Sequence, residues 1–199
     1  MPEFGRFYQR YADIYSFLVA FLNWKADDTA PATKAKVAKA FKSKPFKGGS
    51  SYRHFYQDLV ANLARQERLG LQEIQYASPG HFDVQGREDA FEDVQGVIRW
   101  FMDHRPDIQK KSSHLKAYLS KAGLLRMAGS SFLPDDPRAN FIKTTAEELN
   151  ASMHGPDFAT IKELSQDNAL VAAKIVLSFY RRVDDASQFF SQGRVNFSD

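Results

Sequence analysis

The 199-residue sequence contains no cysteine. This absence excludes disulfide bonds, thiolate zinc sites, iron–sulfur clusters and cysteine nucleophiles. Because disulfides form in oxidising compartments, a chain without them fits a reducing one, and we expect a cytoplasmic protein.

Long apolar runs are lacking as well. The longest is IYSFLVAFL at residues 14–22, whereas a membrane-spanning helix needs about 20 apolar residues. Arg6 and Arg10 precede this run, as basic residues do in a signal peptide, but Glu3 and Asp13 flank it and no small-residue cleavage site follows directly. We therefore expect a buried amphipathic helix here.

Motifs that identify a serine nucleophile or a phosphate-binding loop are also missing. The chain has no Gly-x-Ser-x-Gly elbow, no phosphate-binding Gly-x-x-x-x-Gly-Lys and no Gly-x-Gly-x-x-Gly.

The acids of EDAFED at 88–93 fit the start of a helix, where the dipole favours negative charge. We expect no cofactor and no metal site, because no two histidines have a zinc-like spacing of three to five residues. The histidines are His54, His81, His104, His114 and His154.

One short stretch, RWFMDH, is similar in spacing to the helical HEPN-type ribonucleases, in which Arg is followed after four residues by His. The resemblance implies that His104 acts as acid or base and that Arg99 holds phosphate. Those ribonucleases usually carry a polar residue directly after the Arg, whereas this chain has Trp100. A basic helix end favoured by the dipole is the simpler interpretation, and we expect no catalytic residue.

Aromatic residues and helical periodicity are what the chain has in abundance. It contains 17 Phe and 8 Tyr, which indicates a substantial core, since aromatic side chains bury large areas. Apolar residues recur every three or four positions over 5–24, 51–68, 88–103 and about 165–192. The predicted fold is mainly α, a bundle-like single domain over 1–199 that carries one small β-hairpin.

The 88–103 segment has the strongest periodicity. Gly96 costs about 1 kcal/mol relative to Ala in mid-helix, which suggests a close crossing by another helix or by the hairpin. Pro106 is expected to end this helix, because the residue before a proline disfavours the helical conformation. Three residues are predicted to face the core: Val94, Ile98 and Phe101.

The following segments carry weaker patterns. Two short helices are predicted within 107–128, and 129–141 is predicted to be a loop. Thr145 and Glu148 have the spacing of a capping box for a short helix at 146–153.

Residues 71–86, LQEIQYASPGHFDVQG, predict the hairpin. Ile74 and Tyr76 alternate with polar residues, as do Phe82 and Val84, around Ser-Pro-Gly turn chemistry. An odd-numbered loop pairs Tyr76 with Phe82 and Ile74 with Val84, which places the apolar residues on one face. Because an isolated hairpin is marginal in water, we expect that face to lie on helices.

The hairpin also predicts an interface. A two-stranded ribbon has two unpaired edges, which can pair with a strand of another chain. Its outward polar face has no catalytic pairing, and its candidate interface residues are Gln75, Asp83 and Gln85.

The segment 25–50 is basic and is expected to be mobile outside a predicted helix at 31–43. Lys36, Lys39 and Lys42 would share one face of that helix, and Phe41 and Phe46 would be available for base stacking. A solvated face is the alternative. The candidate nucleic-acid contacts are Lys34, Lys36, Lys39, Lys42, Lys44 and Lys47.

The leading hypothesis is a non-enzymatic helical protein that acts through protein–protein contacts, as a homodimer or other homo-oligomer. The alternative is a protein that binds nucleic-acid phosphates non-specifically through the lysine strip. The sequence does not define a small-molecule ligand.

Overall fold

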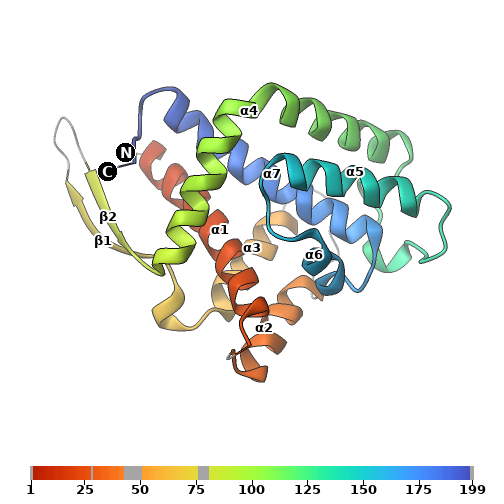
Figure 1. The fold of residues 1–199 in the computed structure, drawn as a ribbon, viewed down its shortest axis with the longest axis horizontal. Coiled ribbons are helices and arrows are strands. Elements are labelled where there is room, and N and C mark those ends of the chain that lie inside the picture. The colour runs from red at the N-terminus through yellow and green to blue at the C-terminus, as the bar shows by residue number, and fades with distance from the viewer. Residues whose placement is uncertain (1, 28, 43–50, 76–80, 198–199) are drawn as a thin grey trace.

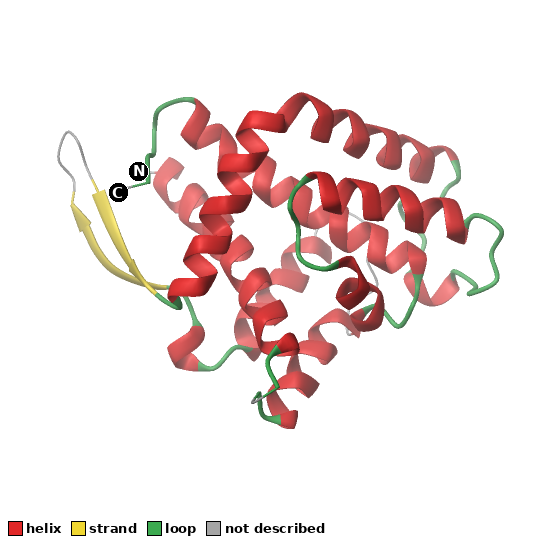
Figure 2. Cartoon of the chain, in the orientation of Figure 1, coloured by secondary structure: helices red, strands yellow, loops and turns green. Residues whose placement is uncertain are grey.

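The structure is a computed structural model that describes residues 2–27, 29–42, 51–75 and 81–197. It confirms a mainly α fold with one two-stranded hairpin (Figures 1 and 2). No described helix is long and apolar enough to cross a membrane. The elements in chain order are α1 (Pro2–Lys25), α2 (Pro31–Lys42), α3 (Ser51–Asn62), the 3₁₀ turn η1 (Arg65–Glu67), β1 (Gly70–Gln75), β2 (His81–Gln85), α4 (Glu88–Lys121), the 3₁₀ turn η2 (Gly129–Ser131), α5 (Ala139–Ser152), α6 (Phe158–Leu164) and α7 (Ala169–Ser191).

Helix α7 is the central element. It packs against α1, α4, α5 and α6, and Figure 1 shows it crossing the middle of the helical body. Residues 169–179 are buried apart from the half-buried Val171. A helix that is apolar around its whole circumference is typical of a helix enclosed by others, and the sequence ALVAAKIVLSF meets that condition apart from Lys174 and Ser178.

Aromatic side chains join α1 to α2, α3 and α7. The ring centroid of Phe17 lies 4.7 Å from that of Phe179 and 6.2 Å from those of Phe41 and Phe55. Aromatic pairs at such distances add about 0.5–1.5 kcal/mol beyond the area that they bury. Many of the phenylalanines in the sequence therefore pack in the core.

The predicted end of the fourth helix at Pro106 is wrong. Helix α4 runs from Glu88 to Lys121 with Pro106 inside it, and the two short helices predicted after it do not form. Proline inside a helix costs about 3 kcal/mol, but each fully buried Ile or Leu beyond it contributes about 1.5–3 kcal/mol. The buried positions continue through the proline at spacings of three, four or seven: Val94, Ile98, Phe101, Ile108, Ser112, Leu115 and Leu119.

The long helix is bent. Figure 1 shows α4 rising past α1 and then changing direction to run along the top of the body. Sharp bends in helices are typical of internal prolines. The three residues predicted to face the core, Val94, Ile98 and Phe101, are fully buried, which confirms that assignment.

Helix α5 begins earlier than predicted, at Ala139, so part of the predicted 129–141 loop is helical. Thr145 is therefore not a cap. Its buried hydroxyl donates to the carbonyl oxygen of Phe141 at 2.8 Å, a bond within the helix. The cap residues that form lie further along the chain: Asp157 caps α6 and Asn168 caps α7, each by accepting a backbone N–H.

The strands pair in a register that differs from the predicted one. Ile74 pairs with Phe82 and Leu71 pairs with Val84, with a bulge between Leu71 and Glu73. The partner of Phe82 lies two positions earlier than predicted and the partner of Val84 three positions earlier, so the apolar residues stay on one face while the partners change. The bulge absorbs one extra residue in β1.

Within its described residues the hairpin does not lie on helices as expected. Figure 1 shows both strands extending away from the helical body, and within the described residues the strands pair extensively only with each other. Leu71 is 39% exposed and Val84 is half-buried. Among the described residues of the hairpin, its base contacts the helical body. There Gly86 contacts the Tyr15 ring so closely that an added Cβ would lie 2.4 Å from the hydroxyl oxygen.

Candidate functional site

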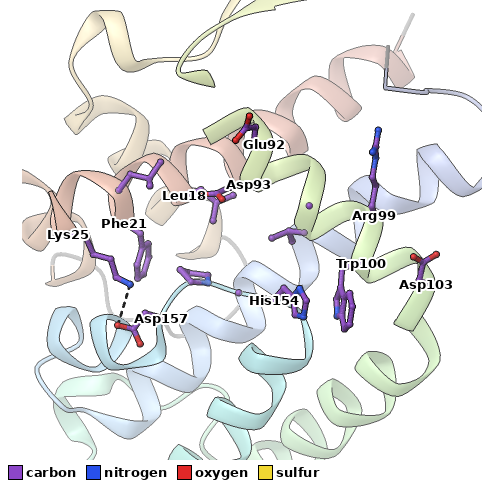
Figure 3. Close-up of a pocket in the computed structure, with 15 residues that line it drawn as sticks. Leu18, Phe21, Lys25, Glu92, Asp93, Arg99, Trp100, Asp103, His154 and Asp157 are labelled. Carbon is purple, nitrogen blue, oxygen red and sulfur yellow. Dashed lines mark ion pairs between the residues drawn. The ribbon is translucent and has the colours of Figure 1, made fainter. Parts of the chain in front are cut away.

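A groove of about 570 Å³ lies between α1, α4 and the turn that joins α5 to α6 (Figure 3). Its floor is formed by buried apolar side chains from two helices, Leu18 and Phe21 of α1 and Val97 of α4. Trp100 and His154 form the opposite wall in Figure 3. The size falls within the range of small-molecule sites, about 300–1,000 Å³.

The turn that closes the groove is held by Asn150. The Asn150 side-chain amide donates to the carbonyl oxygen of Pro156 at 2.7 Å. Gly155 lies against the same side chain, and a Cβ at this position would lie 2.3 Å from Asn150 Oδ1. Only glycine fits here, and His154 beside it adopts a left-handed backbone conformation with φ 52°.

Trp100 lies between two histidines. Its ring centroid is 3.7 Å from that of His104 and 3.7 Å from that of His154, with interplanar angles of 18° and 14°. The indole N–H donates to the carbonyl oxygen of Ser152 at 3.0 Å. This stack fixes the α5–α6 turn against α4 and covers both faces of the indole.

The Arg99 and His104 pair is not assembled as a ribonuclease site would require. The Arg99 guanidinium lies over the Phe197 ring at 5.4 Å, and in Figure 3 it points away from Trp100 and His154. His104 stacks on Trp100, with Nδ1 at 3.0 Å from the Trp100 carbonyl oxygen. The two side chains therefore contact different aromatic rings.

Carboxylates at the groove differ in their surroundings. Partial burial raises the pKa of Asp93, and the nearby carboxylates of Asp89 and Glu92 raise it further. The pKa of Asp157 is lowered, first by the backbone N–H of Ala159 that its carboxylate accepts. Asp157 also pairs with Lys25 at 3.5 Å. The other carboxylates at the rim all come from α4.

Gly96 lines the groove and is exposed. A Cβ added there would meet no atom within 4 Å. The predicted close crossing of another helix or of the hairpin is therefore wrong, and the glycine instead leaves the α4 backbone open to the groove.

The three candidate interface residues of the hairpin lie on its strands. Asp83 and Gln85 are exposed, and Gln75 pairs through its backbone with His81, although its side chain is outside the described residues. Gln85 accepts a hydrogen bond from the Gln72 side chain. Asp83 is directly opposite Glu73, and this like-charge pair weakens the ribbon slightly.

The lysine strip is only partly described. Lys36 and Lys39 are exposed on α2 and Lys34 is half-buried. Lys42 ends α2, with its side chain undescribed, and Lys44, Phe46 and Lys47 lie outside the described residues. The use of Phe41 for base stacking is wrong, because its ring is 2% exposed and packs on Phe17, Phe21 and Phe55.

Three buried charged side chains, an ion pair and a lysine, escaped the sequence analysis. Asp13 and Arg182 form an ion pair of 2.6 Å between α1 and α7, with both side chains almost fully buried. Lys174 is 0% exposed and its ammonium donates to the carbonyl oxygen of Met127 at 2.6 Å. Burial lowers the pKa of Lys174 to about 8. The one sequence signal for Lys174 was a single lysine within the mostly apolar first part of α7.

Among the described residues no group of three or more His, Asp or Glu side chains is arranged to hold a metal ion. Comparison with models of protein families, with curated proteins and with solved structures found no match to this chain. The residues and their geometry are therefore the basis for any proposal about function.

Proposed function

We propose that the protein acts through contacts with other protein chains and that the β1–β2 hairpin makes a contact between two copies. The observation that carries the proposal is the position of the hairpin, which extends away from the helices with Leu71 exposed. The absence of cysteine favours a cytoplasmic location for this activity.

The physical reason is the marginal stability of a lone hairpin. Two strands without a packed face are barely stable in water, and each outer edge of the ribbon leaves backbone groups available for another strand. Pairing of two hairpins about a two-fold axis adds main-chain hydrogen bonds. It also brings the cross-strand pair Leu71 and Val84 of each copy towards its counterpart, so that apolar surface leaves water.

Analytical ultracentrifugation over a range of protein concentrations tests the proposal. We expect a mass of twice 22.6 kDa at high concentration. Leu71→Arg places a charge on the apolar face and is expected to abolish the dimer. Met102→Arg adds the same charge at an exposed apolar position on α4, away from the hairpin, and is the matched control. A wild-type protein that remains at 22.6 kDa at all concentrations refutes self-association.

We propose nucleic-acid binding as the second candidate, because Lys36 and Lys39 are exposed one helical turn apart on α2. Each phosphate neutralised on duplex DNA adds about −0.9 to the slope of log affinity against log salt. Two engaged lysines thus contribute about −2. The double variant Lys36→Gln/Lys39→Gln should flatten the slope by that amount.

The control for this second test is Lys110→Gln/Lys116→Gln, which removes two exposed lysines from α4. A fluorescence titration of a labelled duplex at several salt concentrations provides the slopes. Equal slopes for wild type and the α2 variant would reject the lysine strip as a binding surface.

A further inference from the structure

The groove between α1, α4 and the α5–α6 turn combines an apolar floor with a charged rim. Leu18, Phe21 and Val97 form buried parts of the floor. At the rim, Figure 3 shows Asp93 on the side of α4 that faces α1, with Lys25 and Asp157 together at another end. An occupant of this groove needs an apolar body and one polar group.

The charge of that polar group follows from the ion pairs around the groove. Lys25 is paired with Asp157, and Arg99 lies over the Phe197 ring. Three acids of α4 also line the groove, and no ion pair within the described part of the chain includes them: Glu92, Asp93 and Asp103. These three acids outnumber Arg99, whose charge the Phe197 ring does not neutralise, so the lining of the groove carries net negative charge.

We propose that this groove binds a small organic cation, whose apolar group lies on the Leu18, Phe21 and Val97 floor and whose ammonium group contacts Asp93. The site is separate from the hairpin, so the proposal does not depend on self-association. An inorganic cation would leave the floor unused, and an apolar anion would meet the acids of α4.

The local electrostatics of Asp93 support the occupant. Partial burial and the carboxylates of Asp89 and Glu92 raise the pKa of Asp93. An ammonium group beside it offsets both effects, because an opposite charge within a few ångströms favours the ionised carboxylate.

The absence of a side chain at Gly96 also supports a ligand. The position lies in mid-helix, where glycine destabilises the helix relative to alanine, and the surrounding space would accept a Cβ without contact. Packing therefore does not require glycine here. An open backbone beside the floor lets a ligand approach α4 closely.

The test uses three probes that separate charge from apolar contact. Phenethylammonium has a ring and a cation, 3-phenylpropionate has the same ring with an anion, and ethylammonium has the cation alone. Isothermal titration gives the affinities, and backbone amide spectra locate binding through the Gly96 signal. We expect phenethylammonium to bind about fivefold more tightly than either other probe, as one surface-strength ionic or apolar contact allows.

Two variants test the residues. Asp93→Asn keeps the shape of the side chain and removes its charge, and it should weaken phenethylammonium binding by about fivefold. Asp107→Asn, on the same helix but not lining the groove, is the matched control and should leave binding unchanged. Gly96→Leu should block the groove to all three probes. Circular dichroism verifies that each variant is folded.

Three outcomes would overturn the proposal. One is equal affinity for phenethylammonium and 3-phenylpropionate, which would show that charge is not recognised. Another is unchanged binding by Asp93→Asn, which would place the cation elsewhere. The third is no binding of phenethylammonium to the wild type at millimolar concentration, the weakest affinity expected of a specific site.

Discussion

Lys174 offers the sharpest test of the packing around α7. Its side chain is fully buried, and its ammonium donates to the Met127 carbonyl oxygen in the segment that follows α4. Burial lowers the pKa of this lysine from 10.5 to about 8. We consider the variant Lys174→Met, which keeps an unbranched side chain of similar length and removes the titrating group.

The expected effect follows from proton linkage. The folded-state pKa lies below the unfolded value, so the unfolded chain binds more protons between pH 8 and 10.5 and the free energy of unfolding rises with pH in that window. The difference between the two pKa values is worth about 3 kcal/mol at 1.36 kcal/mol for each pH unit. About 2 kcal/mol of this change falls between pH 7 and pH 10.

At pH 7 the variant gains by no longer burying a charge and loses a charged hydrogen bond worth about 1.5–3 kcal/mol. These two effects nearly cancel, so the stability at one pH is uninformative. The dependence on pH is the diagnostic quantity, because it reports only the titration of this group.

Urea unfolding followed by circular dichroism at several pH values between 7 and 10 provides the measurement. We expect the wild-type free energy of unfolding to rise relative to that of Lys174→Met by about 2 kcal/mol across this range. Lys116→Met, at an exposed site on α4, should follow the wild type. Parallel pH profiles for wild type and Lys174→Met would refute the burial of a charged lysine in α7.

Three further predictions concern α4. Phe101→Ala should lower the free energy of unfolding by about 3–5 kcal/mol, because the side chain is fully buried. Met102→Ala, at an exposed neighbour, should cost less than about 1 kcal/mol in the same urea titration. Pro106→Ala should raise the free energy of unfolding by up to about 3 kcal/mol, since it restores a helical hydrogen bond, and a loss of stability would show that the bend itself is required. Gly96→Ala should raise the thermal midpoint through about 1 kcal/mol of helix propensity, and a lower midpoint would reveal a contact at Gly96 that the geometry lacks.

Local sequence patterns determined the helices with strong periodicity. Val94, Ile98 and Phe101 were assigned to the core because residues three and four apart share one helix face, a property of the backbone that needs no tertiary information. The hairpin was likewise predictable, because alternation of period two and a Ser-Pro-Gly sequence are local signals.

Tertiary structure decided where local signals competed with packing. Pro106 predicts a helix end, but the side chains of Ile108, Leu115 and Leu119 are buried beyond it, and their burial outweighs the lost hydrogen bond. Thr145 has the chemistry of a cap, yet it lies inside α5, where its hydroxyl bonds to a carbonyl of its own helix.

The position of the hairpin and the existence of the groove also belong to the tertiary structure. The alternation in β1 and β2 defines an apolar face but does not say whether a helix covers it. The groove is formed by Phe21, Trp100 and His154, which come from three parts of the chain and approach one another only in the folded protein. Sequence periodicity specifies which side of an element avoids water, whereas its partner depends on long-range packing that no local pattern encodes.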